Sequence, residues 1–218
     1  MSGSVWNPLG WINTAFADFI SYLQRGVGAI VRTVQDKLTD TVSAAEFGAK
    51  GDGVTDDSAA LQLCINTGRV IDLCGLTYLV STKLLFNVAG TVFKNGTLKW
   101  NGTNGVSKLA DISAANVTFK FVIFDGNNKQ PAGSLLYVAS NTVRPRFHNC
   151  TFQNLLGTLG LSDQLNNMYG LLISPYGVTN FEVLNCIFKD FEKRNDGTGF
   201  AATVGAGFTG GIFFLTDD

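Results

Sequence analysis

The chain has 218 residues, with 16 basic and 17 acidic side chains and a formal net charge of −1. This balance argues against an electrostatic nucleic-acid binder, which would carry an excess of Lys and Arg. Apolar residues make up 45% of the sequence, which is enough for a sizeable core and excludes a wholly disordered chain. The 25 glycines and 17 phenylalanines, with only 15% charged residues, indicate a mainly β protein with many turns.

Residues 1–40 differ from the rest, because their apolar residues recur at a helical spacing. Two series with a spacing of seven interleave: Leu9, Phe16, Leu23 and Ile30, and Ile20, Val27 and Val34. The pattern predicts a helix that is packed on its own domain, belongs to a short oligomerising stem, or lies on a membrane surface. A trimeric stem would use Phe16, Ile20, Leu23, Val27, Ile30 and Val34.

A turn rich in glycine and aspartate follows, and then one short helix. We expect the helix over residues 57–67, because Thr55, Asp56 or Asp57 can cap its start and Gly68 can end it. One apolar face of this helix can cover the first coil of the structure that comes after it.

From Val70 onward, short β segments repeat along the chain. Four of them align with an apolar residue at the second place and another five places later. The aligned pairs are Phe93 and Leu98, Phe119 and Phe124, Phe147 and Phe152, and Val183 and Phe188. Offsets of 26, 28 and 36 residues between successive pairs predict a β-solenoid whose coils hold several short strands each. The longest offset leads us to expect a loop over residues 156–176.

Two further columns of this alignment are interpreted as structural. Asn95, Asn149 and Asn185 share one column, where side-chain amides could form a hydrogen-bond ladder at a turn. Cys150 and Cys186 share the next column and are expected to be small core residues. The chain ends in what reads as a further coil, so we expect it to be the N-terminal piece of a longer polypeptide.

Few residues suit a metal or redox site. The four cysteines include no Cys-x-x-Cys pair, and His148 is the one histidine. We therefore expect no metal site and no cofactor. Asp18 and Arg25 interrupt the one apolar segment near the start, so neither a secretory signal nor a membrane span is expected.

Residues 47–62 carry a family resemblance. The run F-G-A-K-G-D-G-V-T-D-D followed by A-L-Q is similar to the opening of the pectate lyase and polygalacturonase superfamily. The preceding V-Q-D-K-L at residues 34–38 narrows the resemblance to bacteriophage tailspikes and capsule depolymerases. The firm resemblance covers residues 31–86, and its motifs specify a fold rather than a reaction. Asp52, Asp56 and Asp57 match its fold motif, so we interpret them as structural.

The resemblance implies a right-handed parallel β-helix in a homotrimeric virion protein, made in the host bacterial cytoplasm. Residues 1–41 would be the virion-attachment and helical neck region, and residues 42–218 the N-terminal portion of the β-helix. Its partners would be phage tail or baseplate proteins and host capsular or O-antigen polysaccharide, with no nucleic acid and no membrane. Trp6, Leu9 and Trp11 would provide the virion contact, because aromatic side chains often anchor protein–protein contacts, or would instead pack within the trimer.

Three acidic residues are candidates for a catalytic role. Glycoside cleavage commonly uses two carboxyl groups about 5–10 Å apart. The alignment places Asp125 and Asp190 two coils apart in neighbouring columns, with Glu192 beside Asp190, so these three are the candidate catalytic residues. The alternatives are a polysaccharide-degrading tailspike, of which this piece alone would be inactive, a non-catalytic adaptor or receptor-binding tail protein, and a secreted pectin-degrading enzyme.

Overall fold

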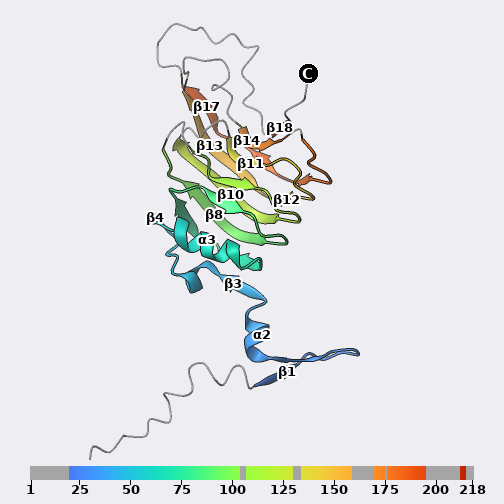
Figure 1. The fold of residues 1–218 in the computed structure, drawn as a ribbon. Helices are drawn as coiled ribbons and strands as arrows, with labels where there is room; N and C mark the ends of the chain where they lie inside the picture. The colour runs from blue at the N-terminus through green and yellow to red at the C-terminus, as the bar shows by residue number, and fades with distance from the viewer. Residues whose placement is uncertain are drawn as a thin grey trace, which may run out of the picture. The chain divides into compact units, whose positions relative to one another are not determined.

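The computed structural model describes residues 20–103, 107–129, 134–158, 169–174, 176–194 and 212–214. The chain divides into two compact units, residues 1–42 and residues 43–218. Figure 1 labels the elements in chain order. No helix within the described ranges is long and apolar enough to cross a membrane.

The first unit contains a β-hairpin where the sequence predicts a helix. Strands β1 (Ser21–Leu23) and β2 (Val31–Thr33) pair antiparallel, and the short helix α2 (Val34–Leu38) follows. The prediction of a helical stem is therefore wrong over residues 20–33. The physical reason is the turn, where Gly26 and Gly28 have φ angles of 147° and 84°, far from the roughly −63° of an α-helix.

The second unit begins with the segment that resembles the tailspike opening. Strand β3 (Thr41–Ser43) spans the boundary, and the unit continues with the 3-10 helix η1 (Ala44–Phe47), β4 (Asp52–Asp56) and α3 (Ser58–Asn66). The short helix predicted over residues 57–67 is thus confirmed. Its apolar face is fully buried through Leu61, Cys64 and Ile65, and it contacts both η1 and β7.

The three aspartates of this segment hold it in shape. Asp52 accepts hydrogen bonds from the backbone N–H groups of Val54 and Thr55 at 2.9 and 2.7 Å. Asp57 is 3% exposed, and its carboxylate accepts from the backbone of Lys50 and Gly51 at 2.7 and 3.0 Å. Asp56 accepts from the backbone N–H groups of Ser58 and Ser81, which tie the start of α3 to the following strands. Their structural interpretation is confirmed.

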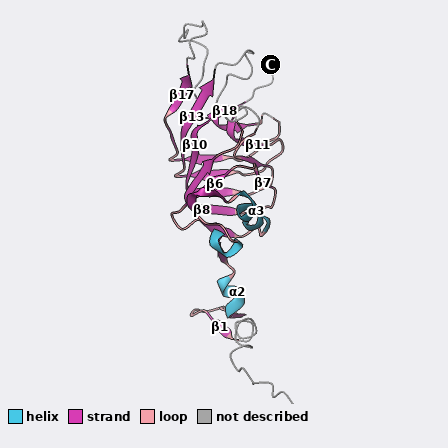
Figure 2. Cartoon of the chain, turned by 90° about the vertical axis from the view of Figure 1, so that its left-hand side faces the viewer, coloured by secondary structure: helices cyan, strands magenta, loops and turns pink. Residues whose placement is uncertain are grey.

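Parallel strands make up most of the second unit. They are β5 (Val70–Asp72), β6 (Thr77–Val80), β7 (Leu84–Phe86), β8 (Val92–Trp100), β9 (Ala110–Ile112), β10 (Thr118–Lys129), β11 (Ser134–Val138), β12 (Arg146–His148), β13 (Thr151–Thr158), β14 (Tyr169–Ile173), β15 (Glu182–Leu184), β16 (Ile187–Phe188), β17 (Phe191–Arg194) and β18 (Ile212–Phe214). One sheet runs in the order β15, β12, β10, β8, β5, β3, and a second in the order β18, β14, β11, β9, β7. The neighbours from β5 to β15 in the first sheet, and all neighbours in the second, are parallel and come from successive turns of the chain, so the strands stack as coils of a parallel β-helix (Figures 1 and 2).

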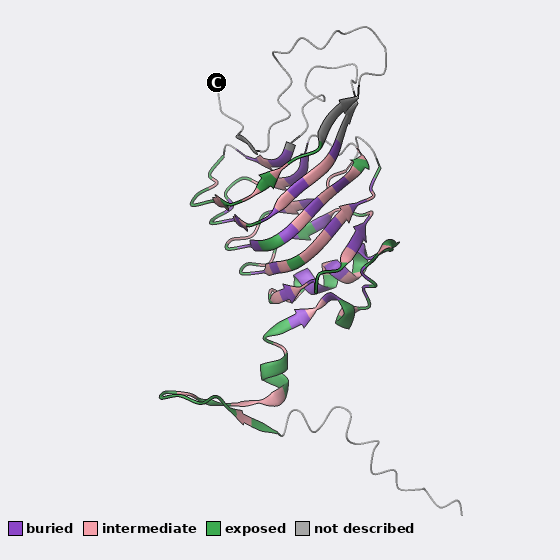
Figure 3. Ribbon diagram, turned by 180° about the vertical axis from the view of Figure 1, so that it is seen from behind, coloured by how far each residue is buried: buried purple, intermediate pink, exposed green. Residues whose placement is uncertain are grey.

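The repeat register predicted from the sequence is confirmed. One column of paired residues is Phe93, Phe119, Phe147 and Val183, and the other is Leu98, Phe124, Phe152 and Phe188. Phe119 and Phe147 stack with ring centroids 5.1 Å apart, and Phe152 and Phe188 at 4.7 Å. Figure 3 shows buried and more exposed positions alternating along the strands. This alternation is expected because successive side chains of a strand point to opposite faces of the sheet.

The asparagine column marks a bend rather than an amide ladder. Asn95, Asn149 and Asn185 have φ angles of 60°, 54° and 52°, and asparagine adopts this left-handed region more readily than other side chains. In the described part of the chain no hydrogen bond joins their side chains, although the backbone N–H of Asn149 donates to the carbonyl of Leu184. The column is therefore structural, as predicted, but its role lies in the backbone conformation and not in a ladder of side-chain amides.

Two details of the solenoid prediction can also be compared with the structure. Cys150 is fully buried, which confirms it as a small core residue, and Cys186 is half-buried. A loop is expected over residues 156–176, but β13 continues to Thr158 and β14 occupies Tyr169–Ile173, and residues 159–168 lie outside the described ranges.

Candidate functional site

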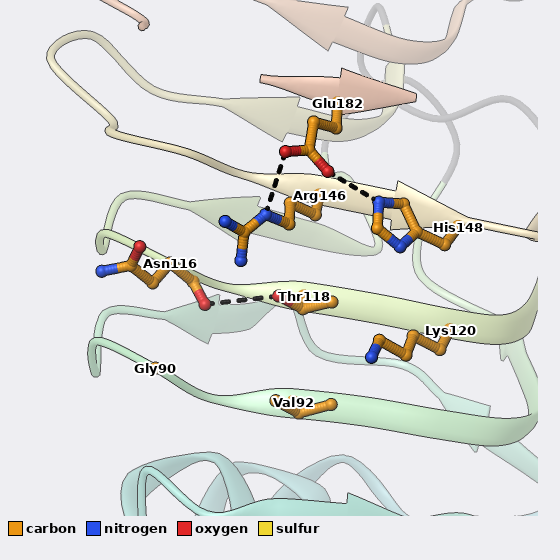
Figure 4. Close-up of a pocket in the computed structure, with 8 residues that line it drawn as sticks. All are labelled: Gly90, Val92, Asn116, Thr118, Lys120, Arg146, His148 and Glu182. Atoms are coloured by element: carbon orange, nitrogen blue, oxygen red, sulfur yellow. Dashed lines mark hydrogen bonds and ion pairs between the residues drawn. The ribbon is translucent and has the colours of Figure 1, made fainter. Parts of the chain in front are cut away.

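A groove lies on the outward face of β8, β10, β12 and β15. It has a volume of about 560 Å³ and is lined by Gly90, Val92, Asn116, Thr118, Lys120, Arg146, His148 and Glu182 (Figure 4). Most of the lining is a consequence of the repeat, because Val92, Thr118, Lys120, Arg146, His148 and Glu182 each adjoin a member of the column Phe93, Phe119, Phe147 and Val183, here called the phenylalanine column. Arg146 and His148, for example, flank buried Phe147.

Charged side chains from two successive coils meet at one end of this groove. Arg146 and Glu182 are register partners, and Arg146 Nε lies 3.3 Å from Glu182 Oε1. His148 Nε2 lies 2.9 Å from the other carboxylate oxygen, Oε2. The hydrogen bond with His148 and the positive charge of Arg146 lower the pKa of Glu182 from its ordinary value. Glu182 is therefore ionised at neutral pH and cannot serve there as a proton donor.

Other lining residues offer hydrogen-bonding groups to a ligand. Lys120 is exposed, and its ammonium has no ion-pair partner among the described residues. Asn116 is also exposed and sits at a bend of the coil with a φ angle of 59°. With Arg146 partly engaged by Glu182, the groove presents donors suited to ligand hydroxyl, carbonyl or carboxylate oxygens.

The candidate catalytic residues from the sequence lie outside this groove. Asp125 is half-buried, and its carboxylate accepts hydrogen bonds from Gln153 at 3.1 Å, Asn154 at 3.0 Å and the backbone N–H of Asn127 at 2.7 Å. These contacts give Asp125 a structural role between coils.

The partners proposed for Asp125 do not join it in a described cluster. Asp190 is exposed at a bend with φ 56°, and its carboxylate lies 3.6 Å from the ammonium of Lys189. Glu192 belongs to β17, where it is the register partner of Leu156, and its side chain lies outside the described residues. No group of three or more potential metal ligands occurs in the part of the chain that the structure describes.

The residues predicted for the stem and the virion contact are only partly described. Trp6, Leu9, Trp11 and Phe16 lie outside the described residues. Ile20, Leu23, Val27 and Ile30 are exposed on the β1–β2 hairpin, and Val34 begins α2.

The sequence contains a signal for the groove in the charges of successive coils rather than in paired acidic residues. In the aligned segments R-F-H and E-V-L, Arg146 and Glu182 occupy the same outward place one coil apart. Opposite charges in one outward column predict an ion pair on the surface of a solenoid, because stacked strands lie about 4.8 Å apart.

The comparison with known proteins supports the resemblance that the motif suggests. No protein-family model matches the chain. A stretch of 66 residues, 30% of this chain and 8% of the relative, is 42% identical to the tail spike protein of an Escherichia phage. The resemblance to phage tailspikes is confirmed. The β-helix also resembles the tailspike protein of E. coli bacteriophage HK620, solved as a point mutant in complex with a pentasaccharide, with a TM-score of 0.51 and 13% identity over 84% of this chain.

Each of these tailspikes is much longer than the present chain. The chain covers 8% of the Escherichia phage tail spike protein and 41% of the HK620 structure. At 13% identity the HK620 likeness shows the fold alone. The activity, ligand and partners of the whole protein therefore remain to be proposed from the site.

Proposed function

We propose that this chain is part of a phage tailspike that binds host surface polysaccharide along the groove on β8, β10, β12 and β15. The single observation that carries the proposal is an open groove with exposed donor groups on the face of a parallel β-helix. A tailspike of this fold, that of HK620, has been solved with a pentasaccharide bound. The ligand would be a capsular or O-antigen chain.

We propose binding rather than cleavage at this groove. Glycosidases commonly place two carboxyl groups across the scissile bond. Within the described lining Glu182 is the one carboxylate, and one of its oxygens contacts the Arg146 guanidinium while the other contacts the His148 imidazole. These contacts favour a receptor-binding role for this stretch, and a polysaccharide-degrading activity of the whole tailspike would use other residues.

The first unit is proposed to join copies of the chain in a homotrimer. Its exposed large apolar side chains are Ile20, Leu23, Val27, Ile30, Val31 and Leu38. A two-stranded hairpin is marginally stable in water, and an exposed apolar cluster of this density is typical of an interface. Light scattering should give a mass near three chains for the wild type and a lower mass for Leu23→Asp. A monomeric wild type at micromolar concentration would contradict the trimer.

We further propose that Trp6, Leu9 and Trp11 bind a phage tail or baseplate protein, which places the mature protein on the virion after its synthesis in the bacterial cytoplasm. The test is to delete residues 1–11 and measure incorporation of the spike into tails. Loss of incorporation with retained solubility supports the contact, whereas normal incorporation contradicts it.

Polysaccharide binding can be tested on a broad panel of candidate ligands. The protein is applied to an array of purified capsular and O-antigen polysaccharides, and the strongest binder is titrated against Lys120→Ala. Loss of a charged hydrogen bond should weaken binding about tenfold. Lys50→Ala is the matched control, because Lys50 is also exposed and lies outside the groove. Absence of binding to every polysaccharide, or equal affinities for the two variants, would contradict the proposal.

A further inference from the structure

One aromatic residue breaks the asparagine column at the bend of the coil. Phe121 has a φ angle of 55°, between the values of 60° at Asn95 and 54° at Asn149 in the coils on either side. Asparagine is enriched in this left-handed region, whereas a bulky side chain there is a rare outlier. The coil containing Phe121 therefore keeps a residue that its own backbone disfavours.

Packing does not account for this phenylalanine. Its side chain is 59% exposed, while Phe119 and Phe124 on the same strand are fully buried. Phe119 and Phe124 also pack against each other with centroids 5.3 Å apart. Phe121 takes part in no ring–ring contact among the described residues. The Phe121 ring therefore contributes little packing to the fold, although a phenylalanine at this position strains the backbone.

The position of Phe121 links it to the groove. Phe121 directly follows Lys120, which lines one end of the groove beside His148 (Figure 4). Lys120 and His148 are register partners on adjacent coils, so the next residues, Phe121 and Asn149, come side by side at the bend. Asn149 is exposed as well, and an amide beside an aromatic face combines apolar and hydrogen-bonding surface.

We propose that Phe121 is the stacking platform of a saccharide subsite that continues the groove around the bend. A pyranose ring presents C–H groups on its face and hydroxyl groups at its edge. The face would pack on the exposed phenyl ring, and the hydroxyls would bond the Asn149 amide and the Lys120 ammonium. This inference rests on the proposed polysaccharide binding and adds the sugar unit that is recognised at one place on the surface. Strained residues are commonly retained at binding sites for such a reason.

The test uses Phe121→Asn, which restores the residue of the column. The variant should melt a few degrees higher than the wild type, because the backbone strain is relieved. Its affinity for the polysaccharide selected on the array should fall about tenfold, and Phe121→Tyr should keep most of the affinity because it keeps the ring. Leu85→Asn is the control, since it removes a 43% exposed apolar side chain from the other sheet.

The outcomes separate this inference from the proposed function. If the wild type binds a polysaccharide and Phe121→Asn binds it equally well, the platform is refuted while the groove stands. If the wild type binds none of the polysaccharides, both the proposed function and the Phe121 platform are refuted. If Phe121→Asn instead changes the mass measured by light scattering and leaves sugar affinity unchanged, the ring belongs to a contact between copies and the platform is likewise refuted.

Discussion

Removing one ring from the phenylalanine column should destabilise the β-helix more than removing an exposed ring two residues away. Phe119 is fully buried and contacts four other rings, with centroids 4.9 Å from Phe86, 6.3 Å from Phe93, 5.3 Å from Phe124 and 5.1 Å from Phe147. Phe→Ala at such a site loses the transfer free energy of the ring and leaves a cavity, which together cost about 3–5 kcal/mol. The several ring contacts place the expected cost of Phe119→Ala near the upper end, at about 5 kcal/mol.

The matched control is Phe121→Ala, which removes the same ring from a 59% exposed position. Its free energy of unfolding should stay within about 0.5 kcal/mol of the wild type. Chemical denaturation followed by circular dichroism measures both variants, and Phe119→Ala should also lower the melting temperature by about 10 °C or more for a chain of this size. A loss below about 1 kcal/mol for Phe119→Ala, or equal losses for the two variants, would refute the stacked core.

Two carboxylates give further predictions. Replacing buried Asp57 by Ala should cost about 2–3 kcal/mol in a denaturation experiment, because the backbone N–H groups of Lys50 and Gly51 lose a charged acceptor; a cost under about 0.5 kcal/mol would contradict its structural role. Glu182 has a folded-state pKa below its ordinary 4.5, so the stability it contributes is present above that pH and is lost as the pH falls through the folded-state value. The difference in melting temperature between the wild type and Glu182→Gln should therefore shrink on acidification below pH 4.5, and a difference that grows there would contradict a stabilising role for the contacts of Glu182 with Arg146 and His148.

The register of the solenoid could be predicted because coil stacking repeats the same environment at the same place. Phe119 and Phe147 align in the sequence and pair in the structure, since an inward residue must match the coil above and below it. The hairpin could not be predicted from apolar spacing, because the seven-residue spacing of Leu23 and Ile30 is a spacing typical of a helix. Gly26 and Gly28 carried the opposing signal, since both are poor helix formers and together make a turn.

The candidate site was harder to predict than the fold, because its members come from four strands whose paired residues lie 26, 28 and 36 positions apart in the sequence. The spacing of acidic residues favours Asp125 as a catalytic group, although in the structure its carboxylate joins two coils. The groove depends on which side chains point outward beside the phenylalanine column, and Arg146, His148 and Glu182 become a cluster only when the register is known. Phe121 needed the backbone angle, which the sequence does not show.

The most direct test of the central claim is a crystal structure of the protein with a fragment of the polysaccharide that the array selects. The sugar should lie along the outward face of β8, β10, β12 and β15, with an oxygen within hydrogen-bonding distance of Lys120 Nζ and a ring on Phe121. A sugar bound instead on the sheet of β7, β9, β11 and β14 would contradict that claim.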